Sequence, residues 1–232
     1  PIGSLLNDAR DLAQQGVGAS GRSGTALVTS LPPLVASYRP DTQLPLEQAI
    51  QEYRELIELQ AENVDGFLAE TIPSIAEATA VLTAADQAGV RIMLGLTVAD
   101  DNGELLRSGE PLADALAAID AFEPLAGVIN CSKPEAVSQA IPILKESRFA
   151  FGAYANGFTA IDALEPGGVV DVLEARHDLD PAQYAKFAAE WLDAGASVIG
   201  GCCEVGPDHI RALSTLLKNR GHEQLAWGDL AA

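Results

Sequence analysis

The chain has 232 residues, of which 48% are hydrophobic, and its 14 basic and 33 acidic side chains give a formal net charge of −19. This apolar fraction is enough to fill a sizeable core, which excludes disorder as the main state. A surface with this much negative charge repels phosphate backbones. We therefore expect no nucleic-acid partner. The apolar runs are shorter than the roughly 20 residues that cross a bilayer, and the first residues do not resemble a signal peptide. We therefore expect a cytoplasmic protein with no membrane association.

Apolar, β-branched segments alternate with segments of helical period along the chain. Helical period is clear over residues 5–15, 75–85 and 184–192. Strands are predicted at 26–31, 66–70, 91–98, 126–131, 149–154 and 197–202. Near-continuous apolar strands separated by amphipathic helices are typical of a parallel sheet that is covered by helices.

Two architectures fit repeated βα units: an open doubly wound sheet and a TIM (β/α)8 barrel. No Gly-x-Gly-x-x-Gly follows a strand, so a dinucleotide-binding sheet has no support and the barrel is favoured. A barrel needs eight strands, whereas six are visible here. We therefore expect a single domain over residues 1–232 that is incomplete at its N-terminal end. The open edges of such a barrel would favour homo-oligomers formed through those edges.

The three cysteines are the residues best suited to carry chemistry. Cys131 ends the fourth predicted strand, and Cys202 and Cys203 end the sixth. All strands of a barrel open on one face at their carboxyl ends, so these thiols can meet there. Adjacent residues of a strand point to opposite faces, so the vicinal pair can share an ion only if the backbone leaves strand geometry, a freedom that Gly200 and Gly201 supply. Three thiolates suit Zn²⁺ and leave a fourth position open, as in catalytic zinc sites.

Two other interpretations of the cysteines remain open. A single free cysteine most often behaves as a small buried hydrophobic residue, which would be the favoured interpretation of Cys131 alone. The vicinal pair is also compatible with a redox couple, although such couples normally have two intervening residues and a helix N-terminus. The position of all three cysteines at strand ends favours the metal site.

Two further side chains lie at predicted strand or helix ends. Glu70 ends the second strand, where a carboxylate of a barrel faces the active-site mouth and can hold an ammonium group. The alternative role for Glu70 is to interact with the dipole of the helix that follows. His209 lies in the first turn of the last predicted helix, where a packing or capping role is favoured over that of a base.

These residues also carry a resemblance to a known family. Residues 200–210, Gly-Gly-Cys-Cys-Glu-Val-Gly-Pro-Asp-His-Ile, resemble the double-cysteine signature of the zinc-dependent homocysteine S-methyltransferases. Residues 127–131 resemble the Val-Asn-Cys element of that family, and residues 70–78 resemble its Glu-Thr-x-Pro stretch. Residues 30–41 contain Ser-Leu-Pro-Pro and Ser-Tyr-Arg-Pro-Asp, which resemble bacterial members that use S-methylmethionine or S-adenosylmethionine.

The resemblance implies a (β/α)8 barrel in which Cys131, Cys202 and Cys203 ligate zinc. It also implies that Glu70 contacts the amino group of homocysteine and that Asn130, beside a ligand position, lies at the substrate. The implied reaction is methyl transfer from a sulfonium donor to homocysteine, giving methionine; betaine and folate donors are not distinguished from it.

The chain departs from the family pattern at two places. The family's Tyr-Pro-Asn-Ser-Gly element is Tyr-Ala-Asn-Gly-Phe at residues 154–158, and no first strand with an Asp-Gly-Gly motif precedes the opening helix. Two alternatives to an active enzyme therefore remain: an inactive zinc-binding relative that serves as an interaction module, and a redox thiol protein without metal.

Overall fold

A computed structural model describes residues 2–21 and 24–230 of the chain. Its six strands form one parallel sheet in chain order, which confirms the predicted architecture. The strands are β1 (Val28–Leu31), β2 (Gly66–Ile72), β3 (Ile92–Leu96), β4 (Ala126–Asn130), β5 (Ala150–Tyr154) and β6 (Val198–Ile199). Every predicted strand is present, but β6 is much shorter than residues 197–202. Within the described residues, β1 and β6 are the two edges of the sheet.

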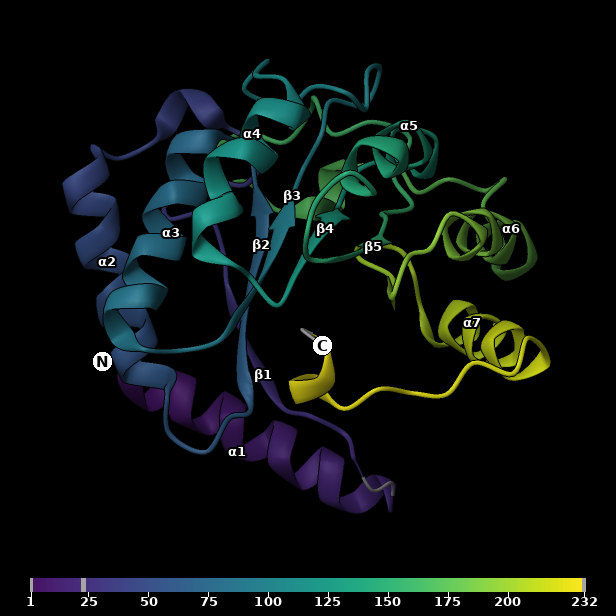
Figure 1. Ribbon diagram of the computed structural model, residues 1–232, viewed down its shortest axis with the longest axis horizontal. Helices are drawn as coiled ribbons and strands as arrows, with labels where there is room; N and C mark the ends of the chain where they lie inside the picture. Colours follow the sequence, from purple (N-terminus) through teal and green to yellow (C-terminus); the bar gives the residue numbers. More distant parts are fainter. Residues whose placement is uncertain (1, 22–23, 231–232) are drawn as a thin grey trace.

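One helix follows each strand and covers the outer face of the curved sheet (Figure 1). These helices are α2 (Leu46–Gln60), α3 (Ile75–Ala88), α4 (Leu112–Ile119), α5 (Pro134–Leu144), α6 (Pro181–Asp193) and α7 (Pro207–Asn219). The main hydrophobic core lies between this ring of helices and the strands. Because all six strands run the same way, their carboxyl ends and the loops that follow them lie at one end of the sheet.

Local sequence determines where several of these helices begin and end. The Ser74 hydroxyl accepts a hydrogen bond from the Glu77 backbone N–H at 3.2 Å, which caps the start of α3. The α3 helix ends at Gly89, whose φ of 65° is a left-handed conformation that glycine adopts without strain. The Asp180 carboxylate caps α6 in the same way as Ser74 caps α3, at 2.8 Å from the Gln183 N–H.

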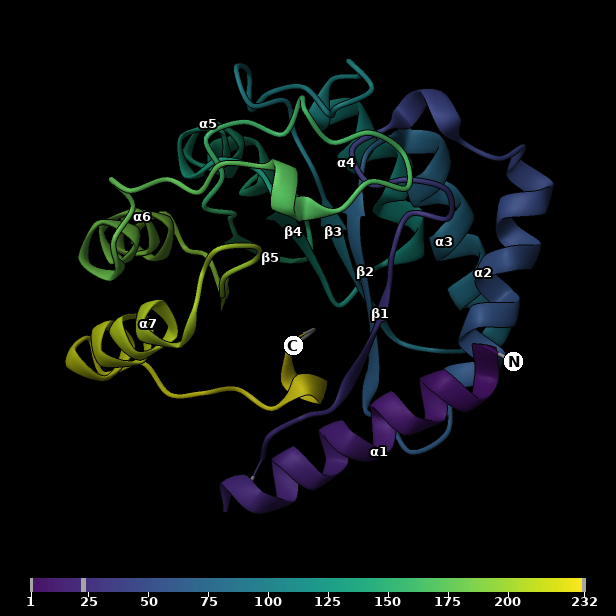
Figure 2. The same ribbon diagram turned by 180° about the vertical axis from the view of Figure 1, so that it is seen from behind.

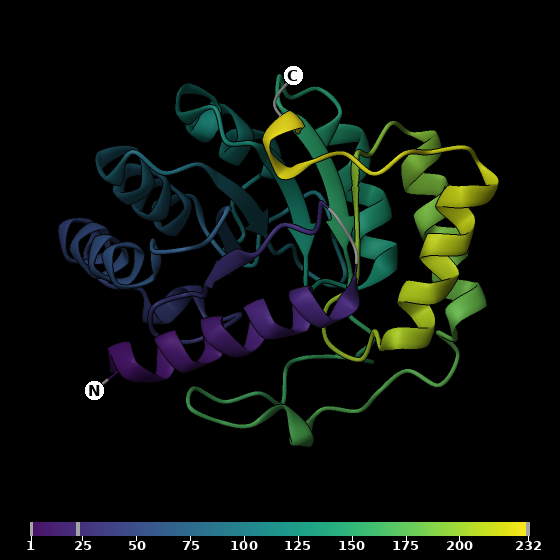
Figure 3. The ribbon, with the colours of Figure 1, turned by 90° about the horizontal axis from the view of Figure 1, so that it is seen from below.

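The first helix, α1 (Ile2–Ser20), lies outside this ring and crosses below β1, as Figure 3 shows. It is longer than the predicted 5–15 at both ends and includes Gly16 and Gly18. None of its side chains is buried, and its side-chain contacts with the rest of the protein include a hydrogen bond from Gln14 to the Asn63 carbonyl at 3.0 Å. No helix in the described part of the chain is both long and apolar enough to cross a membrane.

The segment after α7 returns to the inner face of the sheet, which the sequence did not predict (Figure 3). Trp227 and Leu230 pack there against a small apolar cluster that comprises Met93, Ala126, Val128 and Tyr154. The indole lies so close to β2 that a Cβ atom at Gly66 would be 2.3 Å from Trp227 Nε1. This segment therefore covers part of the interior that an open barrel would expose. Association through the edges β1 and β6 stays a prediction.

Candidate metal centre

The three cysteines meet at the carboxyl ends of β4 and β6, as their positions in the sequence predicted. The Cys131 sulfur lies 2.8 Å from that of Cys202 and 3.6 Å from that of Cys203, and the vicinal pair is separated by 4.0 Å. Cys131 is buried, whereas Cys202 and Cys203 are partly exposed. Among the described residues, these three form a cluster with the geometry to hold a metal ion.

The segment that follows β5 holds the two cysteine-bearing loops together, because β5 lies between β4 and β6 in the sheet. The Cys131 N–H bonds to the Tyr154 carbonyl at 3.2 Å, and the Cys202 N–H bonds to the Ala155 carbonyl at 3.0 Å. The Asn156 side chain, which is fully buried, donates to the Cys131 carbonyl at 2.9 Å. Residues 154–156 belong to the Tyr-Ala-Asn-Gly-Phe element, whose sequence was noted without a role being predicted for Asn156.

Both cysteine loops leave strand geometry before they reach the site. Cys131 has a φ of 48°, so its side chain does not continue the alternation of β4. Strand β6 ends at Ile199, and Cys202 to Val205 form a turn in which Glu204 has a φ of 64°. The predicted departure from strand geometry is thus confirmed. The glycine at 201 has a steric reason, because a Cβ there would lie 2.1 Å from Val205 Cγ1.

Left-handed backbone is concentrated at this site. Six described residues other than glycine have positive φ, and four of them lie in the cysteine cluster or beside it: Tyr38, Thr71, Cys131 and Glu204. Such conformations are costly for residues with a Cβ and occur preferentially at functional sites.

The donor set and its electrostatics fit a divalent cation. Four-coordinate zinc with Zn–S bonds of about 2.3 Å separates its sulfur ligands by roughly 3.8 Å, close to two of the three distances here. Hydrogen bonds from Cys131 and Cys202 lower the pKa of Cys203 to about 3. The hydrogen bond to Cys131 and burial raise the pKa of Cys202. The cluster alone therefore carries about one negative charge, and a bound cation would be needed to remove the remaining thiol protons.

Tyr38, in the loop after β1, contacts the cluster directly. Its hydroxyl lies 2.7 Å from the Cys131 sulfur. Burial, followed by the charge on the cysteines, raises the pKa of Tyr38, so the phenol stays protonated and donates to the sulfur. The Arg107 guanidinium lies 5.0 Å from the centre of the Tyr38 ring and forms an ion pair with Asp100 at 2.8 Å. The sequence indicated this region only as the Ser-Tyr-Arg-Pro-Asp segment.

Glu70 lies on the same side of the sheet as the cysteines. Its carboxylate accepts a hydrogen bond of 2.5 Å from the Ser30 hydroxyl of β1, and it lines the cavity that also contains Cys131, Cys202 and Cys203. That cavity has a volume of about 420 Å³. No lysine or arginine lines it within the described residues, so it offers negative charge to a ligand.

Asn130 is placed to support the backbone beside Glu70. Opposite Gly95 of β3, β2 has two residues, Glu70 and Thr71, and this bulge gives Thr71 a φ of 61°. The Asn130 amide accepts from the Thr71 N–H at 2.8 Å and donates to the Thr71 hydroxyl at 3.1 Å. Asn130 has no exposed surface. Its contact with a substrate stays a prediction, and its hydrogen bonds indicate a positioning role.

Two loops contribute residues to the lining of the cavity, and Figure 2 shows their course. The loop after β1 carries Arg39, and the long loop after β5 carries Glu165 and the short helix η3 (Val170–Val172). Arg39 and Glu165 are joined by an ion pair of 3.4 Å. At the start of α7, His209 bonds to the Leu179 carbonyl at 3.0 Å and packs against Tyr184, in agreement with the packing role expected for it.

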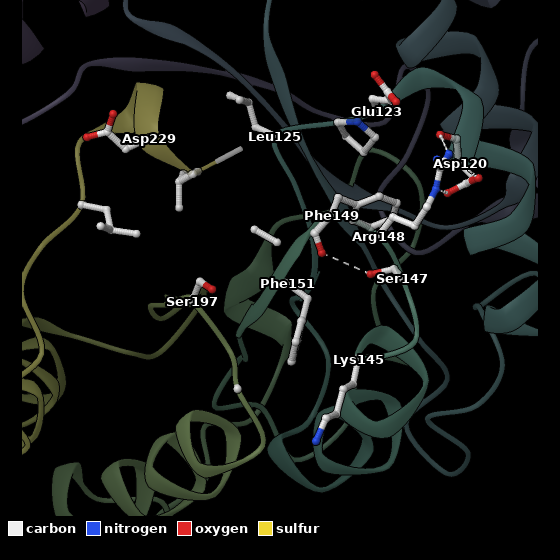
Figure 4. Close-up of a pocket in the computed structure, with 15 residues that line it drawn as sticks. Asp120, Glu123, Leu125, Lys145, Ser147, Arg148, Phe149, Phe151, Ser197 and Asp229 are labelled. Atoms are coloured by element: carbon white, nitrogen blue, oxygen red, sulfur yellow. Dashed lines mark hydrogen bonds and ion pairs between the residues drawn. The ribbon is translucent and has the colours of Figure 1, made fainter. Parts of the chain in front are cut away.

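A larger cavity, of about 680 Å³, lies at the opposite end of the sheet, where β4 and β5 begin (Figure 4). It is bounded on one side by Asp229 and Leu230 of the C-terminal segment. The cationic group of Arg148 in this cavity is already paired with Asp120 at 2.6 Å. The cavity thus contains none of the cysteines and belongs to the end of a barrel where stability, rather than catalysis, is usually found.

These features define a class: a (β/α) protein of the barrel type with a candidate thiolate metal site at the carboxyl ends of its strands. The chain belongs to the homocysteine S-methyltransferase family, whose sequence profile matches residues 2–217. The family resemblance seen in the sequence is thereby confirmed.

The relatives support this assignment and show how much of them the chain represents. Homocysteine S-methyltransferase 1 of Zea mays is 34% identical over 160 residues, which cover 66% of this chain and 47% of the maize protein. The homologue of the same name from Brassica oleracea var. italica is 30% identical over 171 residues, or 72% of this chain and 51% of that protein. The chain thus spans about half the length of the curated relatives it matches.

The solved structures show the same fold. The metallated form of the homocysteine methyltransferase MmuM from Escherichia coli superposes with a TM-score of 0.74 at 24% identity, over 92% of this chain and 70% of that chain. Its apo form gives a TM-score of 0.73 at 22% identity. The TIM-barrel type of fold predicted from the sequence is confirmed.

Proposed function

We propose that this chain transfers a methyl group from a sulfonium donor, S-methylmethionine or S-adenosylmethionine, to the thiolate of homocysteine, giving methionine. The observation that carries the proposal is the convergence of Cys131, Cys202 and Cys203, whose sulfurs lie within 4.8 Å of one another and which all line one cavity. Family membership supports the reaction class, and the two partly exposed sulfurs leave one side of the cluster accessible to a substrate thiol.

Zinc is the ion that this donor set suits, and it would supply the positive charge that keeps a substrate thiol deprotonated at neutral pH. The residues of the chain have the remaining tasks. Glu70 offers its carboxylate to the ammonium group of homocysteine, and Tyr38 holds the Cys131 sulfur by a hydrogen bond. The acidic cavity favours a cationic donor over a neutral or anionic one.

The methyl transfer balances without a protein base. The thiol proton of homocysteine passes to solvent when the substrate binds. The sulfur then uses an electron pair to form the new S–CH3 bond, while the bond between the methyl carbon and the sulfonium sulfur breaks. The donor leaves as a neutral thioether, so one anion and one cation are consumed together. The protein contributes alignment and exclusion of water.

Substitution of a cysteine tests this proposal. The purified chain should hold about one zinc ion and form methionine from homocysteine and S-methylmethionine, as measured by elemental analysis and mass spectrometry. Cys202→Ser should lose both the metal and turnover, and Cys131→Ser and Cys203→Ser should behave alike. Full activity in Cys202→Ser would contradict the assignment. Bound zinc without turnover would favour an inactive relative, and absence of metal would favour a redox protein.

A further inference from the structure

Tyr154 has a buried hydroxyl group whose partner is missing. The residue ends β5 and is 7% exposed, and its hydroxyl oxygen has no hydrogen-bond partner among the described residues. A buried hydroxyl without a partner loses its hydration without compensation, and such groups in native proteins usually have a functional reason. By contrast, the buried Tyr53 hydroxyl bonds to the Glu77 carboxylate at 2.9 Å.

The sheet is shaped to accept this hydroxyl on its inner face. Position 95 of β3 is glycine, and a Cβ there would lie 2.9 Å from the Tyr154 hydroxyl oxygen, 2.9 Å from the Ala69 carbonyl and 2.8 Å from Asn130 Oδ1. Three oxygen atoms therefore converge on the space above this inner-face glycine. The next residue after Ala69 is Glu70, at the bulge that Asn130 supports.

Glu70 is close to Tyr154 but is bonded elsewhere. Burial and the negative charges of Glu70 and Cys202 raise the pKa of Tyr154, and an interaction of its hydroxyl with the Glu70 side chain adds to this, so the hydroxyl keeps its proton and can act as a donor. The Glu70 carboxylate instead accepts the 2.5 Å hydrogen bond from Ser30, which lies on the edge strand β1. Glu70 thus has a formed hydrogen bond to Ser30, and a second donor, Tyr154, lies near its side chain without hydrogen-bond geometry.

We propose that Tyr154 is a positioning residue that orients Glu70 for the ammonium group of an amino acid ligand. When the ligand draws the carboxylate away from Ser30, the Tyr154 hydroxyl donates to the carboxylate oxygen that faces it. The orphaned hydroxyl gains its partner only in the bound state, so its hydrogen bond adds to ligand affinity. This inference rests on the proposed function. It adds that Tyr154 helps the site to distinguish thiols that carry an amino group from thiols that do not.

Three thiols of similar length separate this role from a structural one. Homocysteine carries an ammonium group and a carboxylate, 3-aminopropane-1-thiol carries only the former, and 4-mercaptobutanoate carries only the latter. Their dissociation constants are measured by calorimetric titration of the zinc-loaded protein. Tyr154→Phe should lower the affinity for the two amine-bearing thiols by about 10- to 100-fold, which is the contribution of a hydrogen bond to a charged group. Binding of 4-mercaptobutanoate and the zinc content should stay within twofold of the unsubstituted protein.

Stability and a second site supply the controls. Because Tyr154→Phe removes a hydroxyl without a partner, it should leave the melting temperature of the ligand-free protein unchanged or higher. The matched variant Tyr53→Phe breaks a satisfied hydrogen bond, so it should melt about 2–4 °C lower and bind all three thiols unchanged. Ser30→Ala frees Glu70 in the unbound state, and should therefore bind homocysteine as tightly as the unsubstituted protein or more tightly.

The inference is wrong if the affinity of Tyr154→Phe for homocysteine is within twofold of that of the unsubstituted protein. It is also wrong if the substitution lowers the affinity for all three thiols equally. The failure of the proposed function looks different. In that case the unsubstituted zinc-loaded protein itself would bind none of the three thiols, which would overturn both proposals together.

Discussion

The hydrogen bonds between Asn130 and Thr71 provide the most direct test of how the site is held in shape. Asn130 is fully buried, and its amide makes both of its described bonds to one residue, Thr71. We expect Asn130→Ala to unfold at a markedly lower temperature. The cause would be loss of support for the bulge in β2, which places Glu70 at the cavity.

The magnitude follows from the groups left without partners. The buried Thr71 N–H would lose its acceptor, at about 1–3 kcal/mol, and the second hydrogen bond contributes about 1 kcal/mol. The expected loss in the free energy of unfolding is therefore about 2–4 kcal/mol, which corresponds to roughly 4–16 °C in melting temperature for a chain of this size.

The assay is urea denaturation followed by circular dichroism, together with thermal melting. Asn102→Ala is a matched control, because the Asn102 side chain lies in a turn and, within the described part of the chain, accepts a single local hydrogen bond, from the Glu104 N–H at 3.1 Å. Asn102→Ala should lower the free energy of unfolding by less than about 1 kcal/mol. In a double-mutant cycle, Asn130→Ala and Thr71→Ala should be coupled by about 1 kcal/mol. A melting temperature for Asn130→Ala within about 2 °C of the parent would refute the reasoning.

Three other outcomes are expected. Glu70→Gln should keep its zinc but lower the affinity for homocysteine at least about 10-fold, because a neutral amide cannot pair with an ammonium group. The control Glu47→Gln, at an exposed position, should leave the affinity unchanged. Equal affinities of Glu70→Gln and the unsubstituted protein would contradict the role of Glu70. Trp227→Ala should expose the inner cluster and shift the chain toward oligomers in size-exclusion chromatography, and an unchanged profile would mean that the C-terminal segment does not protect that face. In metal-free protein, iodoacetamide should label Cys203 at similar rates at pH 5 and pH 8, since its pKa of about 3 keeps the thiolate at both, while an ordinary thiol slows by about 1,000-fold. Because the pKa of Cys203 is lower in the folded than in the unfolded chain, the stabilisation of the fold that it gives is present above the ordinary thiol pKa and is lost as pH falls toward 3. If labelling of Cys203 slows as much as that of an ordinary thiol, the cluster does not depress this pKa.

The sequence predicted the sheet because the signals for strands and helices are local. Apolar β-branched runs and segments of helical period identify the βα units, and the parallel order then brings Cys131 to the vicinal pair. The short β6 could not be predicted, since its end depends on the turn that brings Val205 over Gly201. The contacts of α1 were equally inaccessible, because its hydrophobic pattern does not say that no side chain will be buried.

The parts of the site that the sequence did not reveal depend on register and on distant contacts. The bulge at Thr71 exists only relative to β3, so no pattern within β2 indicates it. Asn130 was expected at the substrate because it precedes Cys131, which stays a prediction, and the hydrogen bonds of its amide to another strand were not foreseen. Tyr38 reaches the cluster through a left-handed loop conformation, which the residue type disfavours and tertiary contacts impose.

The left-handed residues constrain how this protein can be made more heat-resistant. Replacement of such a residue by glycine typically recovers about 1 kcal/mol of backbone strain, so a screen for thermostability would select glycine at these positions. At Cys131 and Tyr38 that gain would delete the sulfur or the phenol, and stabilised variants would be recovered with an impaired site. Asn63 and Glu123 have the same backbone conformation in the loops before β2 and β4, away from the cysteines. Engineering should begin at those two positions.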